Sequence, residues 1–102
     1  MIKNVIDGAL CAAQDGRVSD VIDPSTGKSY DVAALSGAGD VDAAYAAATR
    51  AFRTWRRTTP AERQRALLAL AAALEARTDD LVAAEVENTG KPVALTRSEE
   101  TT

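Results

Sequence analysis

The sequence predicts an α+β segment in which N-terminal β-hairpins are followed by three or four α-helices. Residues 1–36 hold short apolar runs separated by turn residues, whereas from residue 37 onward apolar residues recur at three- and four-residue steps. Composition adds a third observation, because 22 of the 102 residues are alanine while Leu, Ile, Val and Phe together number 20. Alanine favours helices but buries little apolar surface. The chain therefore forms helices readily but has few large side chains to hold them together.

Two hairpins are expected in residues 1–36. Asp7-Gly8 separates two short apolar runs and suits a type I′ turn. A second extended run at 18–22 is followed by turn residues at 23–27. Alternating apolar side chains then predict a return strand. The alternating members are Tyr30, Val32 and Ala34.

The apolar spacing of residues 37–57 predicts an amphipathic helix. Asp40 and Asp42 lie near its N-terminal end and a group of arginines lies near its C-terminal end, an arrangement that the helix dipole favours. The apolar stripe comprises Val41, Ala44, Tyr45, Ala48, Phe52 and Trp55.

Capping signals predict the remaining helices. Thr59, Pro60 and Glu62 form a capping box with proline at the first helical position. The helix that follows carries an apolar face of Ala66, Leu67, Leu70, Ala71 and Leu74. Thr78 is expected as the next N-cap and Gly90 as the residue just past that helix. Residues 93–100 are expected to begin another helix.

Composition and residue inventory exclude several function classes. No apolar run reaches the length of about 18 residues that a membrane helix requires. The single cysteine, Cys11, cannot form an internal disulfide, which fits a reducing cytoplasm. Without histidine, neither a typical zinc site nor a histidine-activated nucleophile can be assembled. A net charge of −3 without a basic block argues against nucleic acid as a partner.

The residues taken one by one predict no catalytic and no cofactor-binding group. The glycine-rich stretch at 36–40 lacks the third glycine of a dinucleotide-binding loop, because Asp42 stands there. Asp40 would also repel a phosphate at that helix start. We therefore expect an ordinary connection, and a structural role for Cys11. The helix dipole accounts for Arg56-Arg57.

An ordered set of motifs nevertheless resembles a known family. Val21 to Lys28 resembles a V-x-N-P-A-T-G-E hairpin, and Phe52 to Trp55 resembles A-F-x-x-W. Further matches of this kind are Val5-Ile6-Asp7-Gly8, Asp40-Val41-Asp42-Ala43-Ala44, Thr59-Pro60-Ala61-Glu62-Arg63 and Glu87-Asn88-Thr89-Gly90-Lys91-Pro92. Together they resemble the N-terminal part of NAD(P)-dependent aldehyde dehydrogenases. Within that family they are most similar to the aminobutyraldehyde and betaine-aldehyde branch.

The resemblance implies that the chain is one part of a larger α/β enzyme. Residues 1–36 would be its N-terminal hairpin region, and residues 37–102 would be helices packing on a coenzyme-binding domain that lies outside this sequence, so that no complete domain is present. In the family, the catalytic cysteine thiolate adds to the aldehyde, hydride passes to the nicotinamide, and water hydrolyses the thioester. The groups responsible come later in the chain, and Cys11 does not match the catalytic cysteine motif.

The resemblance also implies one candidate metal site. Some family members hold a monovalent cation through backbone carbonyls of the hairpin and an acidic side chain before T-G-K. The matching positions here are Val21, Ile22 and Asn88. Asn88 replaces the acid with a neutral amide, so the affinity for the cation should be lower.

Two hypotheses on function follow. In the first, the chain is the N-terminal segment of a cytoplasmic, homo-oligomeric aldehyde dehydrogenase that uses NAD or NADP. Its partner is then the remainder of that polypeptide, it contacts neither nucleic acid nor membrane, and alone it neither binds coenzyme nor catalyses. In the second, the chain is a stand-alone non-enzymatic interaction module or a truncated gene product. Under the first hypothesis, the isolated chain should be marginally stable and expose an apolar face along Phe52, Trp55, Leu67, Leu70 and Leu74.

Overall fold

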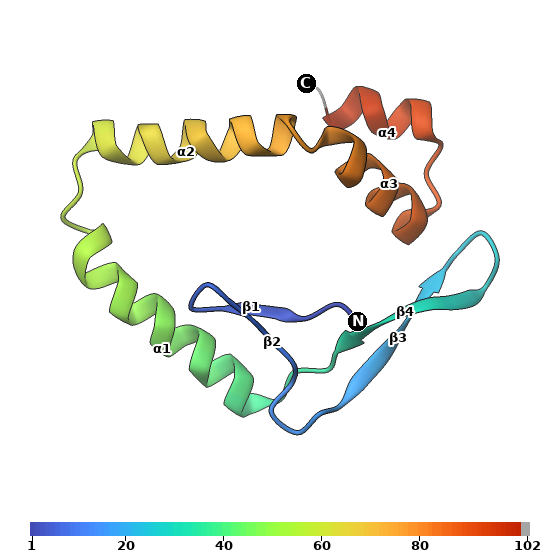
Figure 1. Cartoon of the computed structure of the whole chain (residues 1–102), viewed down its shortest axis with the longest axis horizontal. Coiled ribbons are helices and arrows are strands. Elements are labelled where there is room, and N and C mark those ends of the chain that lie inside the picture. Colours follow the sequence, from blue (N-terminus) through green and yellow to red (C-terminus); the bar gives the residue numbers. More distant parts are fainter. Residues whose placement is uncertain (101–102) are drawn as a thin grey trace. The chain divides into compact units, whose positions relative to one another are not determined.

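A computed structural model describes residues 1–100 of the chain (Figure 1). The strands pair as two hairpins and the helices follow them, which confirms the predicted α+β segment. The strands are β1 (Asn4–Ile6), β2 (Ala9–Cys11), β3 (Val18–Asp23) and β4 (Lys28–Ala34). The helices are α1 (Ala38–Trp55), α2 (Pro60–Glu75), α3 (Thr78–Thr89) and α4 (Val93–Glu100).

The chain divides into two compact units. The first unit contains residues 1–21 together with residues 29–58, so it holds the β1–β2 hairpin and α1. The second contains residues 22–28, which include the turn after β3, together with the chain from Thr59 onward.

The first hairpin has the predicted turn. β1 and β2 are antiparallel, with Ile6 opposite Ala9. Asp7 and Gly8 have φ values of 53° and 75°. A type I′ turn requires positive φ at both of its central residues, so the structure confirms the prediction drawn from this dipeptide.

Besides the two hairpins, the structure has a strand-like contact between the N-terminal residues and β4, which the sequence did not predict. Ile2 forms an isolated parallel bridge with Ala33 of β4. The Ile2 amide donates to the Val32 carbonyl at 2.7 Å, and the Ala34 amide donates to the Ile2 carbonyl at 2.9 Å. The N-terminal ammonium also lies 3.0 Å from a carboxylate oxygen of Asp31. These contacts tie the start of the chain to β4.

β4 does not show the predicted alternation of buried and exposed side chains. Residues 31–34 are all half-buried, whereas Tyr30 is exposed. The bridge to Ile2 covers one edge of the strand, so residues on both of its faces lose contact with water.

Helix α1 packs against β1 with a different face from the one predicted. The buried positions of α1 are Asp40 and Ala47, and Ala43 is half-buried. Val41, Tyr45, Phe52 and Trp55 of the predicted stripe are all exposed. The side chains of α1 that the first unit covers are thus small or polar, and the large apolar side chains of the predicted stripe remain exposed.

The capping box of α2 is confirmed. The Thr59 hydroxyl accepts a hydrogen bond from the Glu62 amide at 3.2 Å, and the Glu62 carboxylate accepts one from the Thr59 amide at 2.6 Å. These two bonds satisfy donors that the first turn of a helix leaves without partners.

The predicted N-cap of α3 is wrong by one residue. Arg77 is the N-cap, and Thr78 is the first helical residue. The Thr78 hydroxyl donates to the Glu75 carbonyl at 2.9 Å, so it serves the end of α2 and not the start of α3. The turn between the two helices is short enough for one side chain to serve either end.

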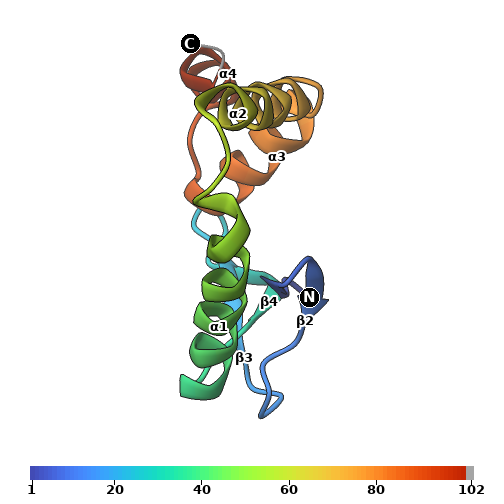
Figure 2. The ribbon, with the colours of Figure 1, turned by 90° about the vertical axis from the view of Figure 1, so that its left-hand side faces the viewer.

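The end of α3 and the start of α4 follow the prediction. Gly90 closes α3 with a left-handed φ of 72°. α3 and α4 lie side by side in both views of the ribbon (Figures 1 and 2). Their contact contains Val82 and Thr96, which are 3% and 1% exposed. Val82 and Thr96 are the buried residues of the described part of the second unit.

Large apolar side chains are mostly exposed. Among the described residues, the buried hydrophobic ones are Ala13, Ala47 and Val82. The apolar face that the sequence analysis expected to be exposed does lie at the surface. The exposed fraction of its side chains ranges from 46% to 63%. Those members are Phe52, Trp55, Leu67, Leu70 and Leu74. The chain thus presents much of its apolar surface to water.

Candidate functional site

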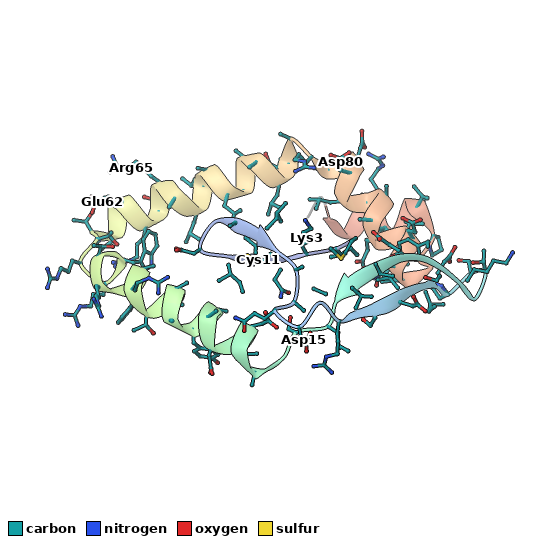
Figure 3. All side chains as sticks on the ribbon, turned by 60° about the horizontal axis from the view of Figure 1, so that its bottom comes forward. Lys3, Cys11, Asp15, Glu62, Arg65 and Asp80 are labelled. Atoms are coloured by element: carbon teal, nitrogen blue, oxygen red, sulfur yellow. The ribbon has the colours of Figure 1, made fainter. Side chains whose placement is uncertain are left out.

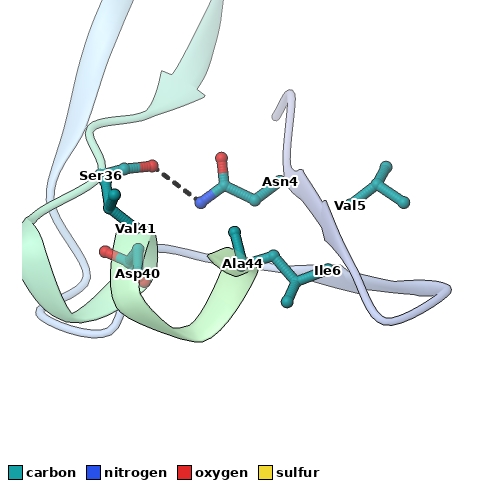
Figure 4. Close-up of a pocket in the computed structure, with 7 residues that line it drawn as sticks. All are labelled: Asn4, Val5, Ile6, Ser36, Asp40, Val41 and Ala44. Atoms are coloured by element: carbon teal, nitrogen blue, oxygen red, sulfur yellow. Dashed lines mark hydrogen bonds between the residues drawn. The ribbon is translucent and has the colours of Figure 1, made fainter. Parts of the chain in front are cut away.

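The glycine-rich connection before α1 borders a small pocket. The pocket has a volume of about 190 Å³, and Figure 4 shows its lining. It lies between β1 and the first turns of α1. The lining residues are Asn4, Val5, Ile6, Ser36, Asp40, Val41 and Ala44. The Asn4 amide nitrogen donates to the Ser36 hydroxyl at 2.8 Å across it.

Asp40 is the buried polar residue at the centre of this connection. Its side chain is 5% exposed. One carboxylate oxygen accepts a hydrogen bond from the Gln14 amide at 3.0 Å, and the other accepts one from the Gly37 amide at 2.9 Å. The Gln14 side chain donates in turn to the Gly39 carbonyl at 3.2 Å. The carboxylate therefore caps the start of its own helix and joins that helix to the chain around Gln14.

This arrangement decides what the connection can bind. Helix N-termini attract phosphate because their amide groups have no partner and the helix dipole is positive there. Here the carboxylate of Asp40 already lies at the N-terminus of α1 and accepts a hydrogen bond from the Gly37 amide. A dinucleotide phosphate does not fit these residues, so the connection is a structural junction.

Cys11 has the surroundings of a structural residue. It is half-buried at the end of β2. Its thiol donates to the Ala9 carbonyl, with a sulfur–oxygen distance of 3.6 Å. Figure 3 shows Cys11 among the labelled side chains. The hydrogen-bond partner of its thiol is thus a neutral backbone carbonyl of the same strand.

The three predicted cation ligands lie in two elements. Val21 is half-buried on β3, its neighbour Ile22 is 46% exposed, and Asn88 is exposed one residue before the end of α3. Ile22 and Asn88 belong to the second unit, whereas Val21 belongs to the first. The cation site stays a prediction.

Within the second unit, the turn after β3 approaches the end of α3. A Cβ atom placed on Gly90 would lie 3.2 Å from Cγ of Pro24 and 3.5 Å from the hydroxyl oxygen of Ser25. The left-handed φ of this position favours glycine, and a Cβ here would also force Pro24 to move by a few tenths of an ångström. Among the side chains that the structure describes, no group of three or more cysteine or carboxylate side chains is placed to hold a metal ion.

Three carboxyl groups have lowered pKa values, and each is explained by local structure. The pKa of Asp15 is lowered mainly by the Arg17 amide and also by the Arg17 guanidinium at 2.6 Å. The N-terminal ammonium lowers the pKa of Asp31, and the Thr59 amide lowers that of Glu62. Figure 3 shows Glu62 at the first turn of α2. These carboxyl groups serve a turn, the chain terminus and a helix cap.

A model of the aldehyde dehydrogenase family matches residues 11–102. The chain belongs to this family. Among curated relatives, 2-aminomuconic semialdehyde dehydrogenases of Danio rerio and Homo sapiens are each 37% identical over 98 residues. That alignment covers 96% of this chain and 20% of each relative. The chain thus spans about a fifth of the length of the aldehyde dehydrogenases it matches.

Solved structures with this fold are similar to the chain over almost its whole length. A putative aldehyde dehydrogenase from Burkholderia cenocepacia is 42% identical with a TM-score of 0.90, covering 94% of this chain and 20% of that one. PnpE in complex with nicotinamide adenine dinucleotide is 40% identical with a TM-score of 0.91, at the same coverage. HpcC from Thermus thermophilus is 33% identical with a TM-score of 0.93, covering 96% of this chain and 19% of that one.

The relatives do not support the aminobutyraldehyde and betaine-aldehyde branch that the motifs suggested. Betaine aldehyde dehydrogenase from Staphylococcus aureus is 23% identical to this chain, a level that shows the shared fold alone. The 2-aminomuconic semialdehyde dehydrogenases are more similar, at 37%. The motifs found in the sequence are turn and capping motifs of the common fold, which explains why they identified the family but not the branch.

No helix in the described part of the chain has the length and apolar character needed to cross a membrane. This agrees with the charged residues found along every helix.

Proposed function

We propose that this chain is the N-terminal part of an NAD(P)-dependent aldehyde dehydrogenase that oxidises an aldehyde to a carboxylate. The family match over residues 11–102 carries the proposal. The bound coenzyme supplies the acceptor for hydride. The residues present here contribute no group to that chemistry, because the glycine-rich connection is closed by Asp40 and Cys11 lies on a structural strand.

The substrate that we propose is a semialdehyde, an aldehyde that also carries a carboxyl group. The names of the curated relatives at 37% identity support this class, since both are 2-aminomuconic semialdehyde dehydrogenases. This proposal replaces a simple aminoaldehyde as the expected substrate. The substrate pocket itself involves residues outside this sequence.

The test is an assay of the full-length polypeptide that carries this segment. Reduction of NAD or NADP should be faster with 2-aminomuconic semialdehyde than with betaine aldehyde. The isolated 102-residue chain should show no turnover with either, and calorimetric titration with NAD should show no binding. Turnover by the isolated chain would overturn the non-catalytic role, and an inactive full-length protein would overturn the proposed activity.

The role that we propose for this chain in the enzyme is to cover other parts of the polypeptide. The exposed apolar side chains of α1 and α2 support this, as does the share of about a fifth of each relative that the chain spans. We also propose that the whole protein is a cytoplasmic homo-oligomer. A stand-alone interaction module is less well supported, because 96% of the chain aligns with one continuous part of longer enzymes.

A monovalent cation held by the carbonyls of Val21 and Ile22 and by Asn88 is a separate proposal. The approach of Pro24 to Gly90 supports it, because it brings the residues after Ile22 near those after Asn88. An amide oxygen ligates a hard cation without net charge. In the full-length enzyme, Asn88→Asp should therefore lower the concentration of K⁺ needed for half-maximal thermal stabilisation. An unchanged K⁺ dependence would overturn this proposal.

A further inference from the structure

The first unit contains two aspartates that are each followed by glycine, Asp7-Gly8 and Asp15-Gly16. Such a dipeptide is chemically labile, because the amide nitrogen of the glycine can attack the carboxyl carbon of the aspartate, and glycine has no Cβ atom to hinder the approach. A Cβ atom placed on either glycine would have no neighbour within 4 Å. The space around the two glycines is therefore alike. Any difference in reactivity depends on the partners of their amides and of the two carboxyl groups.

In Asp15-Gly16, both reacting groups are held by hydrogen bonds. The Gly16 amide donates to the carbonyl of the buried Ala13 at 2.9 Å. One oxygen of the Asp15 carboxylate accepts from the Arg17 amide at 3.0 Å, and the other accepts from the Arg17 guanidinium at 2.6 Å. The Arg17 amide, as the main cause, lowers the pKa of Asp15 and so favours the ionised carboxylate, which an amide attacks poorly. The nucleophile and the electrophile of this dipeptide are both occupied.

Asp7-Gly8 lies in the tight turn between β1 and β2 and lacks these restraints (Figure 1). Gly8 is outside the paired residues of the two strands, and its amide donates no hydrogen bond within the described chain. The side chain of Asp7 is 72% exposed and lies 3.4 Å from one guanidinium nitrogen of Arg50. An exposed ion pair restrains a side chain only weakly. The carboxyl group of Asp7 is therefore free to turn toward the Gly8 nitrogen.

We propose that Asp7 is a site of spontaneous isomerisation to isoaspartate, and that the fold protects Asp15 from the same reaction. The Gly8 nitrogen attacks the carboxyl carbon of protonated Asp7, so that a C–N bond forms, the amide proton is lost and the carboxyl hydroxyl leaves as water. Water then opens the cyclic imide. Opening at the side-chain carbonyl restores aspartate, whereas opening at the main-chain carbonyl gives isoaspartate. One water molecule leaves and one enters, so the mass of the chain does not change.

Isomerisation at Asp7 disturbs the first hairpin. A type I′ turn joins its strands through two central residues whose backbone twist matches that of the strands. Isoaspartate adds one methylene group to the main chain of this turn, so the pairing of Ile6 with Ala9 beside it no longer fits. Because α1 packs against β1, the change also reaches that helix.

The test follows both dipeptides in one sample of the full-length protein that carries this segment. The folded protein is aged near neutral pH in water enriched in a heavy oxygen isotope, because each passage through the cyclic imide places one oxygen from water on the aspartate. Peptide mass spectrometry measures the label at each position. Asp7 should gain label at least about fivefold faster than Asp15, since each hydrogen bond that must open first lowers the reactive population by about this factor. Part of the labelled Asp7 should be isoaspartate, which elutes apart from the aspartate form of equal mass.

Asp15 is the matched control within the same chain, because it too precedes a glycine. In urea, the two aspartates should gain label at rates within about twofold of each other, since the folded contacts are lost. In a second control, Asp7→Glu keeps the charge at the turn and should bring the label at this position to background, because a longer side chain forms the cyclic imide far more slowly.

Three outcomes would overturn the proposal. The first is no label at Asp7 in the folded full-length protein, and the second is equal labelling of Asp7 and Asp15 there. The third is a difference between the two aspartates that persists in urea, because it would assign their reactivities to neighbouring residues in the sequence and not to the fold.

Discussion

At the scale of single residues, Asp40 differs most from its sequence interpretation. The pattern of charges predicted a helix-dipole partner, and the structure adds two hydrogen bonds from the amides of Gln14 and Gly37. Asp42, two residues later, is exposed. The difference arises because the chain around Gln14 passes over the start of α1. No local sequence pattern predicts the hydrogen bond between Gln14 and Asp40.

Replacement of Asp40 should therefore be costly. Asp40→Ala removes the acceptor of the part-buried hydrogen bonds from the amides of Gln14 and Gly37, and we expect a loss of about 1 kcal/mol or more in the free energy of unfolding. The matched control, Asp42→Ala, should change it by less than about 0.5 kcal/mol. Urea-induced unfolding followed by circular dichroism measures both, and equal effects would contradict a special role for Asp40.

A comparison of Gly90 with Gly27 distinguishes the cost of close packing from the cost of an unfavourable backbone conformation. Gly90 and Gly27 both have positive φ, at 72° and 69°. A Cβ atom on Gly90 would lie 3.2 Å from Pro24, whereas a Cβ on Gly27 would have no neighbour within 4 Å. Gly27→Ala should cost about 1 kcal/mol for its conformation alone, and Gly90→Ala should cost more. Equal losses in thermal unfolding would show that Pro24 moves aside freely.

At the scale of elements, the caps and turns explain why the boundaries of strands and helices were largely predictable. The Asp7-Gly8 turn and the Thr59–Glu62 capping box each depend on residues that are at most three apart. The N-cap at Thr78 was wrong because two helices meet there, and its hydroxyl bonds to the Glu75 carbonyl of the preceding helix. Sequence spacing alone does not show whether the Thr78 hydroxyl serves the end of α2 or the start of α3.

The Glu62 cap makes the start of α2 sensitive to acid. The Thr59 amide, as the main cause, lowers the pKa of Glu62 from its ordinary value of 4.5. A carboxyl group with a lower pKa in the folded state stabilises fully above the unfolded value, and this contribution is lost as the pH falls through the folded value. We therefore expect the helicity of the chain to fall as the pH is lowered from about 4.5.

Substitution of Glu62 distinguishes the loss of this helix cap at low pH from the effect of acid on the other carboxyl groups. Glu62→Gln should reduce the helicity near neutral pH and should make the acid loss smaller, as measured by circular dichroism. Glu75→Gln, at the other end of α2, should keep the acid loss because the cap is intact. A Glu62→Gln variant with the same pH profile as the unaltered chain would contradict this role for the capping carboxylate.

At the scale of the whole molecule, the exposed apolar surface implies low stability of the isolated chain. Small domains are marginal even when their cores are complete. Here the buried hydrophobic residues of the described chain are two alanines and one valine. We expect the isolated 102 residues to unfold over a broad temperature range and to bind an apolar dye at ambient temperature. A sharp, cooperative transition at high temperature in calorimetry of the monomer would contradict this expectation.

The candidate site was predictable only in part. That the 36–40 connection is unsuited to phosphate followed from the acid at the helix start, and the structure adds the bonds that close it. The link between Asn4 and Ser36 could not be predicted, because 32 residues separate them and neither carries a motif. The proposed cation ligands came from a resemblance, and their chemistry depends on carbonyl orientation, which residue identity does not encode.

The sequence by itself determined the family and the succession of two hairpins followed by three or four helices, of which the described chain shows four. Turn and capping residues act within three or four positions, so their effects can be read from spacing. Only the tertiary structure decided which face of α1 is covered, how Ile2 joins β4, and that Asp40 binds the amide of Gln14. These outcomes depend on contacts between residues 25 or more positions apart, where packing and not local pattern selects the partner.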